Sequence, residues 1–234
     1  MDADPQRLVT RAVSVLVDDG RVDAAEALWL EYGENNDRAL AKLVLGCSRE
    51  EGGASRAVAY FKAACDRRAA AVRRNGGAPV AYLTGLFNAV LRSTLSDSNS
   101  SSSSVRLDLE AVRIAARHRI RFDTDTYSVL ISHLSRRIPG DDDDCRKAVA
   151  RIMLGLFVRM CKDCVPVDDM VFCHLVPVWV YLDKCPLVTM FWRLHTRGRP
   201  PHKVVQIRRH VMHQAEHWGE QMANRVAMLL VQKL

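Results

Sequence analysis

Apolar residues recur at helical spacing along almost the whole chain. One example follows Arg121, where an apolar stripe at i, i+3, i+4 and i+7 consists of Tyr127, Leu130, Ile131 and Leu134. Good N-cap residues stand directly before this stripe: Asp123, Thr124 and Asp125. Similar stripes alternate with breaks rich in Gly, Pro or polar residues, and no strand-type alternation is present. The pattern therefore predicts an all-α chain of twelve helices.

The predicted helices group into six pairs of comparable length. The pairs begin near residues 6, 37, 79, 124, 169 and 202, at intervals of 31 to 45 residues. Helix pairs that repeat at this period are typical of an α-solenoid, in which stacked pairs bury faces that one pair cannot bury alone. We therefore expect a single α-solenoid domain over residues 1–234, with about six helix–turn–helix repeats in a right-handed superhelix.

Two polar stretches interrupt the helical pattern and are expected to be flexible loops. The first, residues 96–104, is the low-complexity run "SDSNSSSSS". The second, residues 138–144, reads "IPGDDDD" and combines Pro-Gly with four like charges.

Composition favours a helical protein inside a cell compartment. Apolar residues make up 48% of the chain, enough to bury a sizeable core. The longest apolar run, "VFCHLVPVWVYL", is too short to span a membrane. The start "MDADPQ" resembles neither a secretory signal nor an Arg-rich transit peptide. Seven scattered cysteines are an odd number and favour reduced thiols rather than a disulfide framework.

The net charge of +7 is unevenly distributed along the chain. Residues 1–77 are neutral, residues 78–144 carry −1, and residues 145–234 carry +8. A basic excess favours polyanions such as RNA, DNA or acidic lipid, although a solvated Arg-rich surface would give the same composition. The charge thus directs attention to the C-terminal part.

Several stretches resemble pentatricopeptide repeats. The stretch "HRIRFDTDTYSVLISHL" resembles the junction of two such repeats, in which an Asp-ended loop leads into a Thr-Tyr helix start. The stretch "KDCVPVDDMVFCHLVPVW" is a second copy, with Asp168 and Phe172 in the Asp and Tyr places. The turn and helix "DDGRVDAAEALWLEY" and the junction "TRGRPPHKVVQ" are further matches. The tetratricopeptide repeat fits less well, because its Trp, Tyr and Pro spacing is absent.

The resemblance implies a superhelix that binds single-stranded RNA, usually in mitochondria or chloroplasts. In that family two side chains per repeat read one base, and the fourth unit places Ser128 and Asp168 at these positions. The fifth unit has Cys173 in the first position, and the third has Leu83 with Asp123. Because Cys and Leu are poor base readers, the resemblance indicates a degenerate member that acts as a scaffold in a larger ribonucleoprotein.

One basic segment is the candidate contact for the RNA backbone. The segment "WRLHTRGRPPHKVVQIRRH" contains no acidic residue and spans a helix end, a Pro-Pro loop and a helix start. Long basic side chains and free backbone N–H groups at such a place suit phosphate. The predicted contacts are Arg193, Arg197, Arg199, Lys203, Arg208 and Arg209. Trp192 could stack a base, but a core position within a helix pair is the preferred interpretation.

The sequence gives weaker support for a metal site or a catalytic site than for an RNA contact. Cys161 and Cys164 form a CxxC motif that could bind zinc with Cys173 and His174, but buried structural thiols are the preferred interpretation. A row of His210, His213 and His217 could bind a metal, yet no carboxylate is obviously paired with it, so a row facing solvent or RNA is preferred. No Gly-rich phosphate loop, nucleophile elbow or HExxH motif is present. We expect no enzyme activity, no bound metal and no cofactor.

These observations predict an RNA-binding or scaffolding protein of an organellar ribonucleoprotein, such as a mitochondrial ribosome or an RNA-processing complex. The expected partners are single-stranded or ribosomal RNA and other proteins of the complex, with no membrane and no DNA. The expected location is the mitochondrion, or otherwise the cytoplasm. The alternative is a tetratricopeptide-like protein-interaction scaffold with the same fold and no RNA contact.

Overall fold

The computed structural model describes residues 4–32, 36–47, 49–50, 52–75, 82–96, 103–136 and 143–231. Across these residues it has twelve helices and no strand, which confirms the predicted all-α class. The helices are α1 (Pro5–Asp18), α2 (Val22–Tyr32), α3 (Asp37–Cys47), α4 (Gly53–Asn75), α5 (Tyr82–Ser96), α6 (Ser103–Arg117), α7 (Thr124–Arg136), α8 (Asp143–Lys162), α9 (Asp169–Tyr181), α10 (Cys185–Thr196), α11 (Pro201–Glu216) and α12 (Glu220–Val231).

The first helix of each predicted pair begins within three residues of its expected start. Most of the two predicted flexible loops, residues 97–102 of the first and 138–142 of the second, lies outside the described residues. The predicted loop ends are wrong at their margins, because Ser96 belongs to α5, Ser103 and Ser104 belong to α6, and Asp143 and Asp144 belong to α8. No helix in the described part of the chain is both long and apolar enough to cross a membrane.

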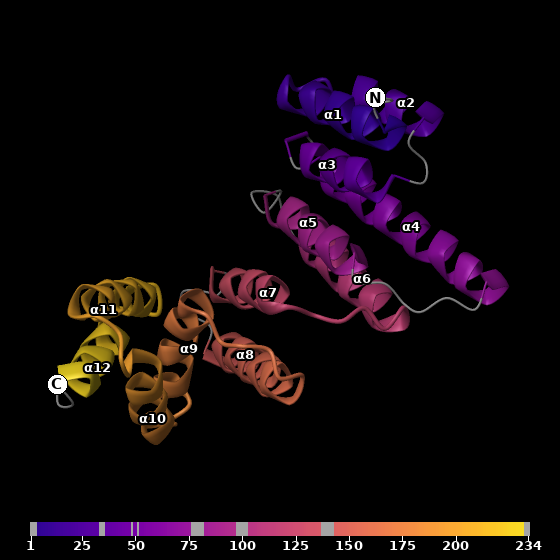
Figure 1. Cartoon of the computed structure of the whole chain (residues 1–234). Coiled ribbons are helices and arrows are strands. Elements are labelled where there is room, and N and C mark those ends of the chain that lie inside the picture. The colour runs from indigo at the N-terminus through magenta and orange to yellow at the C-terminus, as the bar shows by residue number, and fades with distance from the viewer. Residues whose placement is uncertain are drawn as a thin grey trace. The chain divides into compact units, whose positions relative to one another are not determined.

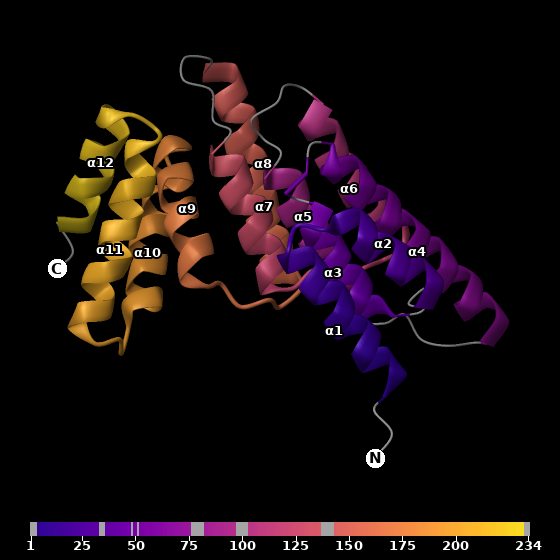
Figure 2. The same cartoon turned by 90° about the horizontal axis from the view of Figure 1, so that it is seen from above.

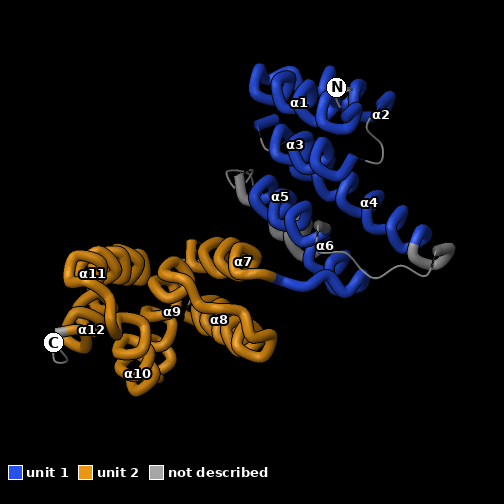
Figure 3. Tube along the Cα trace, in the orientation of Figure 1, with its two compact units in different colours: residues 1–122 blue, residues 123–234 orange. Residues whose placement is uncertain are grey.

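The chain divides into two compact units, residues 1–122 and 123–234 (Figure 3). Unit 1 contains α1 to α6, and its odd-numbered helices pack in series, α1 on α3 and α3 on α5 (Figure 1). Gly46 allows the first of these contacts, because a Cβ built on it would lie 2.9 Å from Cγ1 of Val17. Phe87 continues the core by stacking between Phe61 and Phe122, at centroid separations of 5.5 and 5.3 Å.

Unit 2 is built around α9. Every residue from Val171 to Val180 is buried, and α7, α8, α10, α11 and α12 all contact this helix. Figures 1 and 2 show α9 between the α7–α8 pair and the remaining helices of the unit. A helix that is covered on all sides has no polar face. This position explains the longest apolar run of the sequence.

Left-handed residues end several helices and satisfy their last carbonyl groups. After α1, α6, α8 and α9 the chain forms a Schellman motif, with the left-handed residue at Gly20, Arg119, Cys164 and Asp183, respectively. After α8, for example, the N–H of Val165 donates to the carbonyl of Met160 at 3.0 Å. Three of these four positions lack glycine, so they carry a local conformational cost.

Candidate nucleic-acid interface

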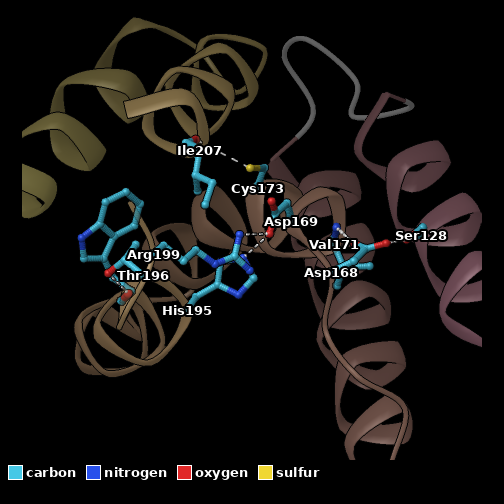
Figure 4. Close-up of polar contacts among 10 residues, drawn as sticks. Ser128, Asp168, Asp169, Val171, Cys173, His195, Thr196, Arg199 and Ile207 are labelled. Carbon is cyan, nitrogen blue, oxygen red and sulfur yellow. Dashed lines mark hydrogen bonds and ion pairs between the residues drawn. The ribbon is translucent and has the colours of Figure 1, made fainter. Parts of the chain in front are cut away.

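Asp168 and Ser128, the predicted base-reading pair, are in direct contact in unit 2. Asp168 is the N-cap of α9, and its Oδ1 accepts a hydrogen bond from the N–H of Val171 at 2.7 Å. Its Oδ2 accepts a hydrogen bond from the hydroxyl of Ser128 at 2.6 Å (Figure 4). The serine proton is therefore committed, and the pair offers only acceptor lone pairs. It can accept N–H donors of a base edge, and it would repel phosphate.

Asp123 has the same role one repeat earlier. It precedes α7, and its Oδ1 accepts from both the N–H and the hydroxyl of Thr126, each at 2.8 Å. The other candidate positions face the protein interior. Leu83 is buried, and the thiol of Cys173 donates to the carbonyl of Ile207 at 3.7 Å. Burial raises the pKa of the Cys173 thiol to about 12. These two side chains are thus engaged in packing.

Asp169, next to the cap, holds the chain that connects α10 to α11. Its Oδ1 lies 2.8 Å from Nε2 of His195 and 2.6 Å from Nη1 of Arg199. Figure 4 shows both side chains directed toward Asp169. The His195 ring also stacks on Phe172, with centroids 4.4 Å apart. Arg199 is therefore tied to an acidic residue thirty positions earlier in the chain. Its first role is to position the start of α11.

The pKa values around Asp169 follow from burial and from the charges in contact. Burial acts to raise the pKa of Asp169, but hydrogen bonds from Arg199 and His195 outweigh it, and the pKa lies below its usual range. Burial, followed by the nearby Arg199 charge, lowers the pKa of His195 despite the attraction of Asp169. His195 is therefore neutral at neutral pH, and it donates its Nε2 proton to Asp169.

The other predicted phosphate contacts lie on α10, α11 and the turn between them. Arg193 is in the last turn of α10, Arg197 is its C-cap, and Lys203 is in the first turn of α11. These three side chains and Arg209 are exposed, whereas Arg208 is half-buried. None of the five forms an ion pair with any described residue. We call the four exposed cations, Arg193, Arg197, Lys203 and Arg209, the basic corner.

The start of α11 lies beside the basic corner, and the N–H groups of Lys203 and Val204 already donate to the carbonyl of Pro200 at 3.0 and 3.3 Å. Its N-cap is Pro200, which provides no side-chain cap, and its first turn contains no acidic residue. By contrast, α9 begins with a capping Asp168 and with Asp169. An uncapped first turn presents partial positive charge, which favours an anion. Trp192 is buried, so it packs in the core rather than stacking a base.

The structure corrects two sequence-based expectations about metal-binding residues. Cys161 and Cys164 are exposed rather than buried, because they lie at the C-terminal end of α8. The expectation that no carboxylate accompanies the histidine row is also wrong, since Oε2 of Glu216 lies 3.7 Å from Nδ1 of His213. Cys173 is buried in α9 as expected, and His174 is buried beside it. Within the described residues no three potential metal ligands come together.

Sequence reasoning missed the ion pair between Asp169 and Arg199, because the two residues become neighbours only through the packing of α9 against α11. The sequence feature that could have indicated this ion pair is the second carboxylate, Asp169, directly after the capping Asp168. Comparison with protein-family models finds no matching family, and comparison with curated proteins finds no match.

Proposed function

We propose that this protein is a helical-repeat scaffold that binds single-stranded RNA, mainly through phosphate contacts at the basic corner. The observation that carries the proposal is a set of exposed cations that pair with no acidic residue in the described part of the chain, beside a helix start that has no side-chain cap. An unpaired basic group gains more from a phosphate than one already neutralised by a carboxylate. Arg199 supports the corner by fixing the turn.

The proposed architecture is an α-solenoid of six helix pairs, related to pentatricopeptide repeats. Serial packing of odd-numbered helices within each unit, α1–α3–α5 and α7–α9–α11, supports it. The capped starts of α7 and α9, with Asp123 and Asp168 in equivalent places, support the repeat register. Following the resemblance, we place the protein in an organellar ribonucleoprotein such as a mitochondrial ribosome or an RNA-processing complex.

Base readout is a minor part of the proposal. Only the Ser128–Asp168 pair has polar side chains in both reading positions, and its acceptors suit a single base with N–H donors. One such contact cannot select a long sequence. Binding should therefore depend mostly on the RNA backbone.

The test compares RNA affinity of two quadruple variants. The first replaces the basic corner by Gln, and the control replaces four exposed cations of unit 1 that form no ion pair with the described residues, Arg11, Arg21, Arg38 and Lys42. Both lose four charges. We expect the corner variant to bind an unrelated single-stranded RNA about tenfold more weakly or worse, while the control stays close to wild type. Helical circular dichroism should be unchanged in both.

A protein-interaction scaffold is the second candidate. Three exposed apolar side chains favour it: Met190 at 45%, Leu194 at 60% and Val205 at 58% exposure, on the same α10 and α11 as the basic corner. Absence of RNA binding by the wild type would support this candidate, whereas equal RNA affinity in the wild type and the corner variant would show that the basic corner is not the RNA contact.

A further inference from the structure

Unit 1 contains a group of arginines that the net charges of the three sequence segments do not reveal. Residues 111–122 include four arginines and no acidic residue, and we call these arginines the α6 cluster: Arg113, Arg117, Arg119 and Arg121. The surrounding segment 78–144 sums to −1 because the run of four aspartates at 141–144 offsets them. That run belongs to unit 2. Counted by unit, unit 1 has 18 basic and 15 acidic side chains, and unit 2 has 16 and 12.

All four side chains of the α6 cluster are exposed, and none forms an ion pair with a described residue. The neighbouring His118 takes the nearby carboxylate, with its Nε2 3.5 Å from Oδ1 of Asp66. Arg113 and Arg117 are four residues apart on one face of α6, a spacing that brings like charges together and destabilises a helix. The helix dipole favours Arg117 in the last turn, but it does nothing for Arg121 beyond the helix. Binding of an anion would relieve this repulsion.

The backbone that carries the cluster is fixed by three separate contacts. The N–H of Ile120 donates to the carbonyl of Ala115 at 2.9 Å, which closes the Schellman motif after α6. The hydroxyl of Thr84 donates to the carbonyl of Arg121 at 2.8 Å. Phe122 stacks on the buried Phe87. The half-buried Ile120 and Phe122 therefore alternate with the exposed Arg119 and Arg121, so the cations are held outward on a rigid segment.

We propose that the α6 cluster is a second RNA contact, which binds phosphates of the same single-stranded RNA independently of the basic corner. This inference rests on the proposed function. A rigid base reduces the ordering cost of binding, and guanidinium groups match phosphate geometry. The contact carries no base readout, because arginines on phosphates are insensitive to sequence.

The test replaces the four arginines of the α6 cluster by Gln in the full chain, beside the same unit 1 control variant. RNA affinity is measured at several salt concentrations with two unrelated single strands of about 30 nucleotides. On a single strand, each phosphate contact contributes about −0.7 to the slope of log affinity against log salt. Loss of four contacts should therefore make the slope shallower by about 3. The control should keep the wild-type slope. Photo-crosslinking should also attach RNA to the peptide that contains Phe122.

The outcomes separate this inference from the proposed function. Wild-type slope in the α6-cluster variant, with weakened binding in the basic-corner variant, would overturn the second contact and leave the proposed function standing. Absence of RNA binding by the wild type would overturn both. A third arm uses phosphatidylserine vesicles, and cluster-dependent binding to them without RNA binding would identify a lipid surface instead.

Discussion

At the residue scale, the carboxylates before α7 and α9 both cap a helix, and the one before α9 has a second role. Asp168 caps α9 and also accepts from Ser128, whereas Asp123 caps α7 through Thr126. The capping role could be predicted from the sequence, because Asp directly before an apolar stripe is a local signal. The resemblance to a repeat family placed Ser128 and Asp168 in one site. The link between Asp169 and Arg199 could not be predicted, since it depends on how two helices pack.

Replacement of Asp168 separates its two roles. Asp168→Ala removes both the cap and the acceptor for Ser128, and it should destabilise the fold by about 1–2 kcal/mol. Asp168→Asn keeps a capping oxygen and should cost less, and Ser128→Ala should cost about 1 kcal/mol or less. Urea unfolding measures all three. Equal stability of Asp168→Ala and wild type would contradict the capping role.

Replacement of Cys164 by glycine should stabilise the fold. Its φ is 55°, in the left-handed region that favours glycine, so Cys164→Gly should raise the free energy of unfolding by about 1 kcal/mol. The converse control is Gly198→Ala, at φ 73° with no atom near the added Cβ, which should lower stability by a similar amount. Thermal unfolding detects both shifts. A destabilised Cys164→Gly would show that the thiol makes a contact worth more than the backbone cost.

Buried His174 predicts acid sensitivity of the fold. It is 2% exposed, and neither ring nitrogen makes a hydrogen bond of normal geometry, although Gln214 lies nearby. Burial, with a smaller effect from Arg136, lowers the pKa of His174 to about 4. Its ordinary value is 6.5, so between these values the unfolded chain binds a proton that the folded chain does not. Stability is therefore complete above pH 6.5 and falls as the pH drops toward 4.

Within that pH window, His174 can change the free energy of unfolding by up to about 1.4 kcal/mol per pH unit. His174→Leu removes the titrating group, so its unfolding free energy should fall less steeply from pH 6.5 to 4.5. His195 has a lowered pKa too and will leave a residual slope in the same direction. An unchanged slope in His174→Leu would show that this histidine is not buried as described.

At the element scale, the positions of the helices along the chain could be predicted from the sequence, whereas the packing of one helix against another could not. Apolar periodicity and stop signals located twelve helices, because both are local properties of the chain. The run from Val171 to Val180 lacks a polar face, so it has no periodic signal for which neighbours cover it. Its central place in unit 2 emerges only from packing. The exposure of Cys161 and Cys164 is similar, since it depends on where α8 ends relative to its partners.

The contact between α1 and α3 depends on Gly46. A Cβ there would lie 2.9 Å from the buried Val17, so Gly46→Ala should destabilise by about 1–3 kcal/mol despite the better helix propensity of alanine. Gly155→Ala in α8 is the matched control, because no atom lies within 4 Å of the added Cβ, and it should stabilise by up to about 1 kcal/mol. Adding Val17→Ala to the Gly46→Ala variant should restore part of the lost stability, because it removes the clashing side chain. A neutral Gly46→Ala would contradict the close approach.

At the scale of the whole molecule, charge must be read along the folded units rather than along sequence segments. Division of the sequence at its polar loops assigned all excess positive charge to residues 145–234. The two compact units instead carry net charges of +3 and +4. The basic corner and the α6 cluster are both exposed and free of ion pairs to described residues. We therefore propose that both units take part in RNA binding, with one site in each.

The most direct test of the account is the salt dependence of wild-type binding to two unrelated single-stranded RNAs of equal length, measured by fluorescence anisotropy. Eight exposed cations with one phosphate each would give a slope of log affinity against log salt of about −6, and partial engagement would give a shallower value. The account predicts a steep slope that is the same for both sequences. A flat salt dependence, or binding to only one of the two RNAs, would contradict it.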